Sequence, residues 1–374
     1  MKKRMKKRIK VLYIVTSCKK TGPSQQLYNL ISYLDRDVFE PLFVTTYAET
    51  SESILTQFVK IVPHKLVEMS KLKMITGQVD SLKNIITEFR PDIIHTSGVL
   101  PDFAITRLGF ENHVLTSRNY IYDDYPAEFG AIKGNILARM HLYALKHTKY
   151  AQCCSESLHN IYSEKENLNL PFIRNGVDTS QFTVPNRNEI SELRRELGLP
   201  LEKKIFVYGA IFNERKNQEF LIKNFLKIKN LDDYCLLLLG DGPMLETLKN
   251  KYKSEAVIMP GKTSRMGSYL RASDYYVSSS KSEGLPNGVL EAMAVGLPVL
   301  LSGIEQHREI FDVDKRIGYI YKPDDDADFV RMFNALVCDN YEDMKKHSSS
   351  SSNNNFSAEK MSLNYQKLYI DIVG

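Results

Sequence analysis

Short apolar runs alternate with amphipathic stretches through the first half of the 374-residue chain. In the amphipathic stretches apolar residues recur at spacings of three and four, which predicts helices, whereas short apolar runs between polar residues predict buried strands. Strands are predicted at residues 11–15, 43–45, 91–95, 114–116 and 150–154, with helices at 78–89 and 134–147. Strands that alternate with helices favour a parallel sheet covered by helices.

The alternation begins again after residues 169–187, a turn-rich stretch that contains Asn175-Gly176. Strands are predicted there at 205–209, 234–239, 255–259 and 275–279, with helices at 216–228, 243–253 and 265–272. We therefore expect two doubly wound, Rossmann-like α/β domains, the first at residues 1–172 and the second at 173–347.

Two segments with different compositions end the chain. Residues 348–355 hold five serines and three asparagines. They have little apolar surface to bury, which predicts a mobile linker. In residues 356–374 the apolar side chains lie on one face of a predicted helix. We expect this C-terminal helix to cross back and pack on the first domain.

The composition is that of an ordinary globular protein with a small basic excess. Hydrophobic residues make up 43% and charged residues 25% of the chain, and the net charge is +5. No apolar run approaches the roughly 18–20 residues that a membrane-spanning helix needs. The five cysteines show no metal-ligand spacing, so we expect no metal site and free thiols in a reducing cytoplasm.

The first ten residues carry seven Lys or Arg. Such a cluster can hold a protein to an anionic membrane, at about 1 kcal/mol for each basic residue near the surface. The segment lacks the apolar core of a secretory signal, and no interleaved aromatics favour nucleic-acid binding. Residues 2–10 are therefore a candidate for peripheral contact with the inner face of the cell membrane. The alternative is a solvated start without a partner.

One stretch, SEGLPNGVLEAMAVGLPVLLS at residues 282–302, combines two carboxylates with a predicted helix start. Its glycines and prolines predict a loop that gives way to a helix near Pro286 or Asn287. Glu283 then precedes the helix, and Glu291 lies about one turn inside it. The N–H groups at a helix start attract an anion. The two carboxylates can accept hydrogen bonds from hydroxyl groups, and the helix start can bind a phosphate. A nucleotide-sugar has both kinds of group.

The first domain offers polar residues near the ends of its predicted strands. Gly22, His95 and Arg118 would lie at the carboxyl edge of the sheet, where doubly wound folds bind ligands. A loop rich in aromatic and acidic residues is expected at 120–125. Only one glycine follows the first strand, so the dinucleotide fingerprint of NAD-dependent oxidoreductases is missing.

These features resemble glycosyltransferase family 4, which has the GT-B fold of two doubly wound domains with a cleft between them. The strongest segment is EGLPNGVLEAMAVGLPVL, supported by FIRNGVDTSQF at 172–182, RKN at 215–217 and GDGP at 240–243. The region 120–130 resembles members that build bacterial capsule or O-antigen polysaccharide.

The resemblance implies transfer of a sugar, with retention of configuration, from a nucleotide-diphospho-sugar to a glycan or lipid-linked acceptor. It implies no metal or other cofactor, and UDP is favoured over GDP as the nucleotide of the donor. The second domain would bind the donor and the first domain the acceptor.

The resemblance also implies roles for single residues. Glu283 would contact the transferred sugar near its reacting carbon, Lys216 would offset charge on the diphosphate, and Glu291 would accept hydrogen bonds from both ribose hydroxyls. The catalytic set is thus Glu283, Lys216 and Arg118. The donor-binding set is Gly22, Arg215, Asn217, Met259, Pro260, Leu285, Pro286, Asn287, Gly288, Val289 and Glu291.

Three positions depart from the family pattern. Ala210 stands where an Arg is often found, a single Gly22 where two glycines are usual, and Arg118 where many members have a histidine. Arg118 would contact the donor sugar or diphosphate, or else form an ion pair with an aspartate at 123–124. His95, one loop away, is the other candidate for the histidine's place.

Other functions fit the same features. A nucleotide-sugar 2-epimerase would need no acceptor, and a pure nucleotide-sugar-binding module would be compatible with the departures at Ala210 and Arg118. A glycosidase also uses two carboxylates, but a phosphate socket between them favours transfer.

Overall fold

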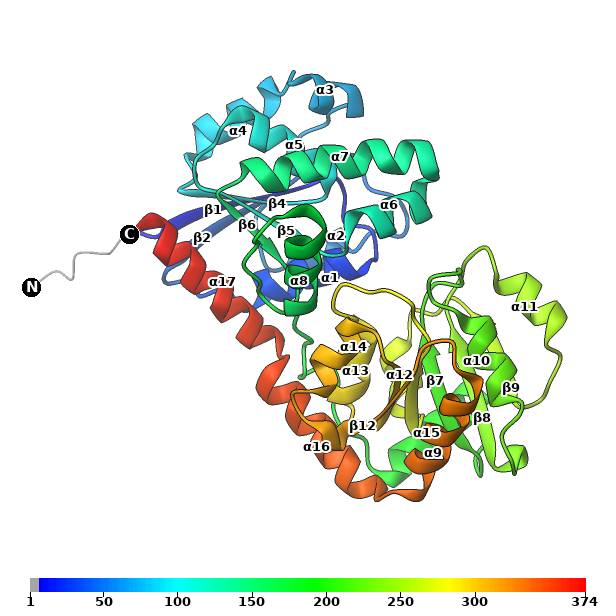
Figure 1. Cartoon of the computed structure of the whole chain (residues 1–374). Coiled ribbons are helices and arrows are strands. Elements are labelled where there is room, and N and C mark those ends of the chain that lie inside the picture. Colours follow the sequence, from blue (N-terminus) through cyan, green and yellow to red (C-terminus); the bar gives the residue numbers. More distant parts are fainter. Residues whose placement is uncertain (1–6) are drawn as a thin grey trace, which may run out of the picture. The chain divides into compact units, whose positions relative to one another are not determined.

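The computed structural model describes residues 7–374, which form two compact units (Figure 1). The first unit comprises the described residues up to Gly176 together with Ala358–Gly374, and the second comprises Val177–Ser357. The first unit thus continues past the predicted boundary at residue 172. Each unit has its own six-stranded sheet.

The first unit is built on a six-stranded parallel sheet with the order β3-β2-β1-β4-β5-β6. The strands are β1 (Ile9–Val15), β2 (Phe39–Thr45), β3 (His64–Leu66), β4 (Ile93–Ser97), β5 (His113–Ser117) and β6 (Tyr150–Cys153). Successive side chains of β1 point to opposite faces of the sheet: Tyr13 lies in one core cluster and Leu12 in the other. Both faces of the sheet are therefore buried, as in parallel sheets whose strands read as continuous apolar runs.

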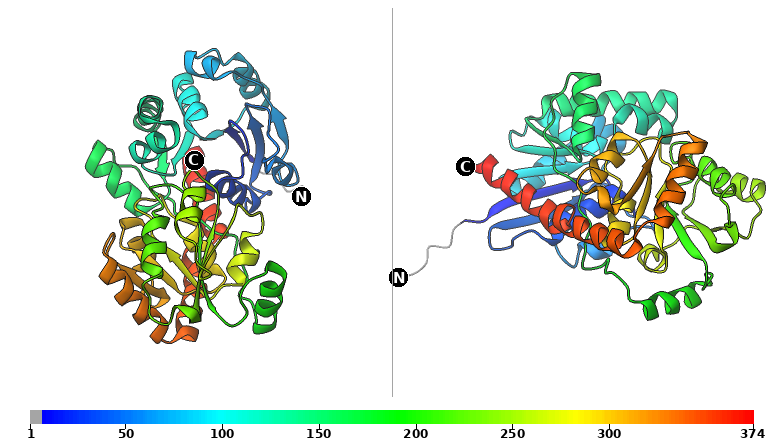
Figure 2. Two further views of the ribbon diagram at one scale, coloured as in Figure 1. Left: turned by 90° about the vertical axis from the view of Figure 1, so that its right-hand side faces the viewer. Right: turned by 60° about the horizontal axis from the view of Figure 1, so that its bottom comes forward.

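Helices cover both faces of this sheet. They are α1 (Gly22–Ser32), α2 (Leu55–Phe58), α3 (Lys71–Thr76), α4 (Asp80–Phe89), α5 (Val99–Leu108), α6 (Ile121–Phe129), α7 (Ala131–His147), α8 (Glu156–Glu166) and α17 (Ala358–Val373). One core cluster includes Leu30 of α1 and Tyr365 of α17, and the other includes Leu82 of α4 and Ile105 of α5. The Ser362 hydroxyl of α17 donates to the carbonyl of Leu30 at 2.8 Å, and Figure 2 shows α17 in red beside the blue α1. The predicted return of the C-terminal helix to the first domain is confirmed.

The second unit repeats this plan with a parallel sheet in the order β12-β11-β10-β7-β8-β9. Its strands are β7 (Lys204–Gly209), β8 (Tyr234–Leu239), β9 (Val257–Gly261), β10 (Tyr275–Ser278), β11 (Val299–Ser302) and β12 (Gly318–Tyr321). Its α-helices are α9 (Arg187–Leu197), α10 (Gln218–Phe225), α11 (Leu245–Lys251), α12 (Met266–Arg271), α13 (Asn287–Ala294), α14 (Glu305–Phe311), α15 (Asp326–Cys338) and α16 (Tyr341–Asn355), and its short 3-10 helices are η1 (Leu231–Asp233) and η2 (Lys315–Ile317). In each sheet the strand order reverses beside the first strand, at β1 and at β7, which is the doubly wound arrangement that the sequence predicts.

In the part of the chain that the structure describes, no helix is long and apolar enough to cross a bilayer. Most of the basic segment at residues 2–10 precedes the described part of the chain, which begins at residue 7. Its contact with a membrane therefore stays a prediction.

The predicted mobile linker at residues 348–355 is wrong. These residues form the second half of helix α16, which packs on α13. Ser348 and Ser352 are fully buried, and the Ser352 hydroxyl donates to the carbonyl of Leu290 at 3.3 Å. The small serine side chains let the two helices approach, and α13 supplies the burial that the tract lacks by itself.

The predicted loop at 120–125 is also wrong. Residues Ile121–Phe129 form helix α6, although Pro126 lies inside it. A Cβ on Gly134 of α7 would lie 2.5 Å from the backbone of Pro126, so the glycine allows the two helices to pack closely. This tertiary contact stabilises a helix that a polar and aromatic segment does not indicate.

Candidate functional site

The loops after β7 and β10 meet at the carboxyl edge of the second sheet, where the strand order reverses. The N–H group of Lys281 donates to the carbonyl of Arg215 at 2.8 Å. The Ser279 hydroxyl donates to the carbonyl of Lys216 at 2.9 Å. These bonds hold the basic pair at 215–216 against the stretch that carries Glu283.

Lys216 and Glu283 form a buried ion pair at this junction. The Lys216 ammonium group donates to Oε1 of Glu283, and Nη1 of Arg215 lies 3.6 Å from Oε2. The Ser280 hydroxyl donates to the same Oε1 at 2.6 Å, and it lies 2.6 Å from the Tyr208 hydroxyl. The side chains of Lys216 and Glu283 are only 13% and 9% exposed. The structure thus brings together two of the three residues in the predicted catalytic set.

The charges around Glu283 keep its carboxyl group ionised. Burial by itself would raise the pKa of this group. The positive charges of Lys216 and Arg215, with the hydrogen bond from Ser280, outweigh burial and hold the pKa of Glu283 below its ordinary value. The junction therefore presents two cations beside a carboxylate that can accept hydrogen bonds from hydroxyl groups.

Glu291 is the other carboxylate of the motif, and its environment is different. It is half-buried on the second turn of α13. Burial raises the pKa of Glu291 to about 7. Among residues 7–374 the Glu291 carboxyl group has neither a hydrogen-bond partner nor an ion-pair partner. A half-buried carboxyl group with a perturbed pKa and no protein partner is a candidate for contact with a ligand.

The start of α13 is shaped for close approach of an anion. Its N-cap residue is Pro286, whose side chain makes no capping hydrogen bond. A Cβ on Gly288 would lie 2.6 Å from the Tyr276 hydroxyl, so only glycine lets the helix start lie this near β10. Leu285 and Val289 are 3% and 0% exposed. Their side chains are therefore not available to a ligand.

The remaining residues of the predicted donor-binding set lie on other segments. Met259 is half-buried and Pro260 is exposed, both in the edge strand β9. Asn217 takes a left-handed conformation with φ 55° before α10, and its side chain donates to Asp324 at 3.0 Å. Gly22 is the first residue of α1 in the first unit, and its contact with the donor stays a prediction.

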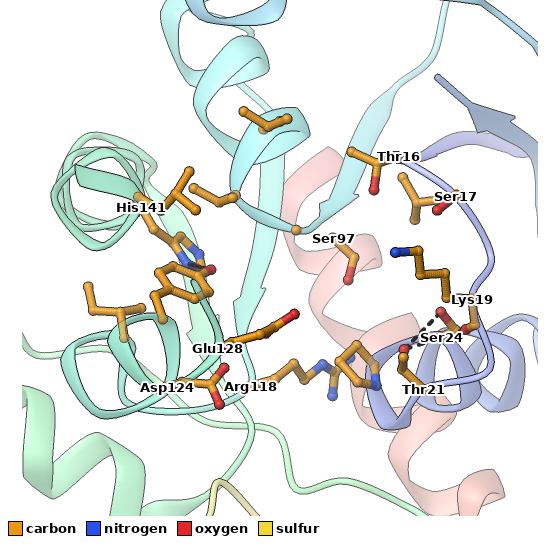
Figure 3. Close-up of a pocket in the computed structure, with 18 of the residues that line it drawn as sticks. Thr16, Ser17, Lys19, Thr21, Ser24, Ser97, Arg118, Asp124, Glu128 and His141 are labelled. Carbon is orange, nitrogen blue, oxygen red and sulfur yellow. Dashed lines mark hydrogen bonds between the residues drawn. The ribbon is translucent and has the colours of Figure 1, made fainter. Parts of the chain in front are cut away.

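The first unit holds a pocket of about 820 Å³. Polar side chains line it from the loops after β1 and β5, from the end of β4 and from α1, α6 and α7. Figure 3 labels Thr16, Ser17, Lys19, Thr21, Ser24, Ser97, Arg118, Asp124, Glu128 and His141. Nη1 of Arg118 donates to Oδ1 of Asn175 at 2.5 Å, and no ion pair joins Arg118 to residues 123–124 in the described structure. The buried Nε of Arg118 has no hydrogen-bond partner among the described residues. Arg118 therefore retains a donor for a ligand.

His95 does not line this pocket. It is 1% exposed within β4, and its Nδ1 lies 2.5 Å from the Tyr369 hydroxyl. Burial, with the nearby positive charge of Arg118, lowers the pKa of His95 well below its ordinary value. His95 is thus a neutral core residue, and of the two candidates for the family's histidine position only Arg118 reaches the pocket.

His141 of α7 is a pocket residue that the sequence does not indicate. Its Nδ1 lies 2.6 Å from the Tyr125 hydroxyl, and its Nε2 lies 3.2 Å from Oδ2 of Asp102. The Thr96 hydroxyl donates to the other oxygen of Asp102 at 2.5 Å. The sequence around His141 shows only an amphipathic helix, so no local signal marks it.

The fold and a family match define the class of the protein. Residues 189–354, most of the second unit, match the family described as glycosyl transferases group 1. Two doubly wound units constitute the GT-B fold, and solved glycosyltransferases share it with this chain. The protein is a glycosyltransferase.

The chain is similar to two curated proteins and to one solved structure. The chain is 25% identical to the O-antigen biosynthesis glycosyltransferase WclY of Escherichia coli over 317 residues. These residues cover 81% of this chain and 83% of WclY. It is 24% identical over 345 residues to the E. coli UDP-Gal:alpha-D-GlcNAc-diphosphoundecaprenol alpha-1,3-galactosyltransferase. This alignment covers 83% of this chain and 79% of that enzyme. The crystal structure of Anabaena Alr3699/HepE in complex with UDP-glucose has a TM-score of 0.77 at 16% identity, with 97% of this chain and 100% of that chain covered. This last likeness shows the fold alone, and membership of family 4 stays a prediction.

Proposed function

We propose that the protein is a retaining glycosyltransferase that moves a sugar from a nucleotide-diphospho-sugar to a glycan or lipid-linked acceptor without a metal. The second unit binds the donor, and the first unit binds the acceptor. The observation that carries this proposal is the arrangement at α13. There the ion pair of Lys216 and Glu283 lies before the helix start at Pro286. The carboxyl group of Glu291, which has no partner among the described residues, lies on the second turn of the helix.

Each part of a nucleotide-sugar has a matching group in this arrangement. The ribose hydroxyls donate to Glu291, and the hydroxyls of the transferred sugar donate to Glu283. The diphosphate lies against the first N–H groups of α13 and the ammonium group of Lys216. The nucleobase lies along the backbone at residues 259–260.

The reaction breaks the bond between the reacting sugar carbon and the diphosphate oxygen, and it forms a bond from that carbon to the acceptor oxygen. Negative charge grows on the diphosphate as the bond breaks, and Lys216, Arg215 and the start of α13 offset it. With retention, the acceptor oxygen enters on the face that the diphosphate leaves. The departing phosphate takes the acceptor's proton, so the protein needs no strong base.

The names of similar proteins support the choice of donor and product. UDP-Gal stands in the name of the E. coli galactosyltransferase, and UDP-glucose is bound in the Anabaena HepE crystal structure. We therefore propose UDP as the nucleotide of the donor. The name of WclY supports a role in bacterial surface polysaccharide synthesis.

Calorimetric titration with a panel of UDP- and GDP-sugars tests the donor site. We expect a UDP-sugar to bind and Glu291→Ala to weaken its binding about tenfold or more, because two hydrogen bonds to a charged group are lost. Glu192→Ala, at an exposed glutamate of α9, is the matched control and should bind like the wild type. Equal affinity in the Glu291 variant would remove this residue from the site. Isomerisation of the UDP-sugar without an acceptor would identify an epimerase instead.

A further inference from the structure

The pocket of the first unit has a polar part and an apolar part. Figure 3 shows Arg118 reaching into it from the end of β5, with Asp124 and Glu128 on one side and Lys19 and Ser97 on the other. The apolar part is lined by Val99, Leu100, Phe129, Ile132, Ile136 and Met140. An occupant that satisfies both parts must itself be amphipathic.

The apolar part is continuous with side chains that are open to solvent. Ile132 and Ile136, one turn apart on α7, line the pocket and are 82% and 56% exposed. On α3, Ile75 also lines the pocket and is 38% exposed, and Leu72 is 69% exposed. We call these four side chains the apolar rim. Large apolar side chains that gather at a pocket mouth mark an interaction surface.

Basic side chains accompany the apolar rim. Lys71 of α3 and Lys133 of α7 are exposed and line the pocket, and Lys73 is exposed on α3. The ammonium group of Lys133 lies 5.0 Å from the centre of the Phe129 ring. Apolar side chains flanked by lysines on amphipathic helices suit an interface with anionic lipids.

On the basis of the proposed transferase function, we infer that the acceptor is a lipid that the pocket takes up from a membrane surface. The apolar rim enters the lipid layer, and the hydrocarbon chain runs past Leu100 and Met140. The head group, which carries a phosphate and hydroxyls, lies at Arg118. There the unpartnered Nε of Arg118 meets a phosphate oxygen, which removes the cost of leaving a buried donor unsatisfied.

A free glycan matches this pocket less well than a lipid does. Carbohydrates are bound through many hydroxyl groups, and the apolar rim offers no hydrogen-bonding side chains to them. Among the similar proteins, the E. coli galactosyltransferase has a diphosphoundecaprenol compound in its name. The polar part of the pocket accommodates a head group of that chemistry, and the apolar part accommodates a chain.

Calorimetric titration of the full chain with farnesyl phosphate tests the pocket. We expect farnesyl phosphate to bind, inorganic phosphate not to bind measurably, and Arg118→Gln to weaken the binding about tenfold. Equal binding of inorganic phosphate would show that the hydrocarbon part contributes nothing and would overturn the inference. Wild-type affinity in Arg118→Gln would overturn it as well.

Sedimentation with vesicles of phosphatidylcholine and phosphatidylglycerol tests the rim. The double variant Ile132→Asp/Ile136→Asp should bind vesicles about tenfold less tightly, and its exposed positions should leave folding intact. The matched control is Leu363→Asp/Ile370→Asp on α17, where the side chains are 56% and 46% exposed. This control should bind like the wild type. An equal loss in both variants, or a loss in neither, contradicts the inference.

UDP-sugar titration of the same preparations separates this inference from the proposed function. The rim variant should bind UDP-sugar like the wild type, because the proposed donor groups lie in the second unit. If the wild type binds UDP-sugar but neither farnesyl phosphate nor vesicles, the lipid inference fails alone. If it binds no nucleotide-sugar, the proposed function fails first.

Discussion

At the scale of single residues, the ion pair of Lys216 with Glu283 leads to a kinetic prediction. Lys216→Ala should lower kcat by about 10²–10³, because one cation that offsets charge on the leaving diphosphate is lost. Steady-state kinetics with a UDP-sugar measures this. Lys223→Ala on α10, at a side chain that is 53% exposed, is the control and should keep the wild-type rate. A loss below about threefold would exclude Lys216 from charge compensation.

The raised pKa of Glu291 predicts a pH dependence of donor binding. Ionised Glu291 accepts hydrogen bonds from both ribose hydroxyls, so donor affinity should rise as pH increases through about 7. Titrations on either side of this pH, with the wild type and Glu291→Gln, measure the effect. The Gln variant should show a flatter profile, and parallel profiles would argue against the ribose contact.

The same pKa shift has a consequence for stability. The native state holds the Glu291 proton up to about pH 7, whereas the unfolded state loses it near the ordinary value of 4.5. The contribution of Glu291 to the free energy of unfolding is therefore greatest at a pH below the ordinary pKa of 4.5, and it is lost as the pH rises through 7. Thermal unfolding should show that Glu291→Gln is more stable than the wild type above pH 7, with the difference shrinking at lower pH. A difference of the opposite sign would mean that the carboxyl group is ionised without penalty.

The sequence identifies Glu283 and Glu291 as a pair but does not distinguish their states. Glu283 is ion-paired because Lys216 arrives from another strand-end loop, and Glu291 has no protein partner in the described structure. Both facts depend on contacts between segments that are distant along the chain. The same holds for Arg118, whose partner Asn175 lies at the end of the first unit.

At the scale of elements, the contact between α13 and β10 leads to a prediction about Gly288. Gly288→Ala would place a methyl group 2.6 Å from the buried Tyr276 hydroxyl, so the helix start must shift. We expect a stability loss of about 1–3 kcal/mol and weaker donor binding. Gly267→Ala in α12 is the control, because its Cβ would meet only Phe182, at 3.7 Å. Thermal unfolding and calorimetry measure both effects, and equal behaviour of the two variants would contradict the packing argument.

Elements with strong apolar periodicity could be predicted from the sequence, and elements that depend on a neighbour could not. The strands of both sheets read as apolar runs because parallel strands are buried on both faces. Helix α6 and the second half of α16 are held by α7 and α13, and their own sequences look like loop and linker. Local composition carries no information about such partners.

At the scale of the whole molecule, the basic N-terminus and the apolar rim predict two separable contributions to membrane binding. Deleting residues 2–7 should weaken binding to anionic vesicles at low salt and have little effect at high salt, because the contribution is electrostatic. The loss in Ile132→Asp/Ile136→Asp should persist at high salt. Vesicle sedimentation at two salt concentrations measures both. Unchanged binding at low salt after the deletion would assign no role to the basic segment.

The packing of α17 on the first unit also affects the order in which the two units can fold during synthesis. Its residues Tyr365 and Tyr369 are fully buried in the core of the first unit, where they meet Thr116 and His95. During synthesis most of the first unit leaves the ribosome before the second unit does, yet its core stays open until α17 has been translated. The second unit is a single continuous segment and can close earlier. The first unit is thus completed after the second, and a chain without α17 exposes apolar surface.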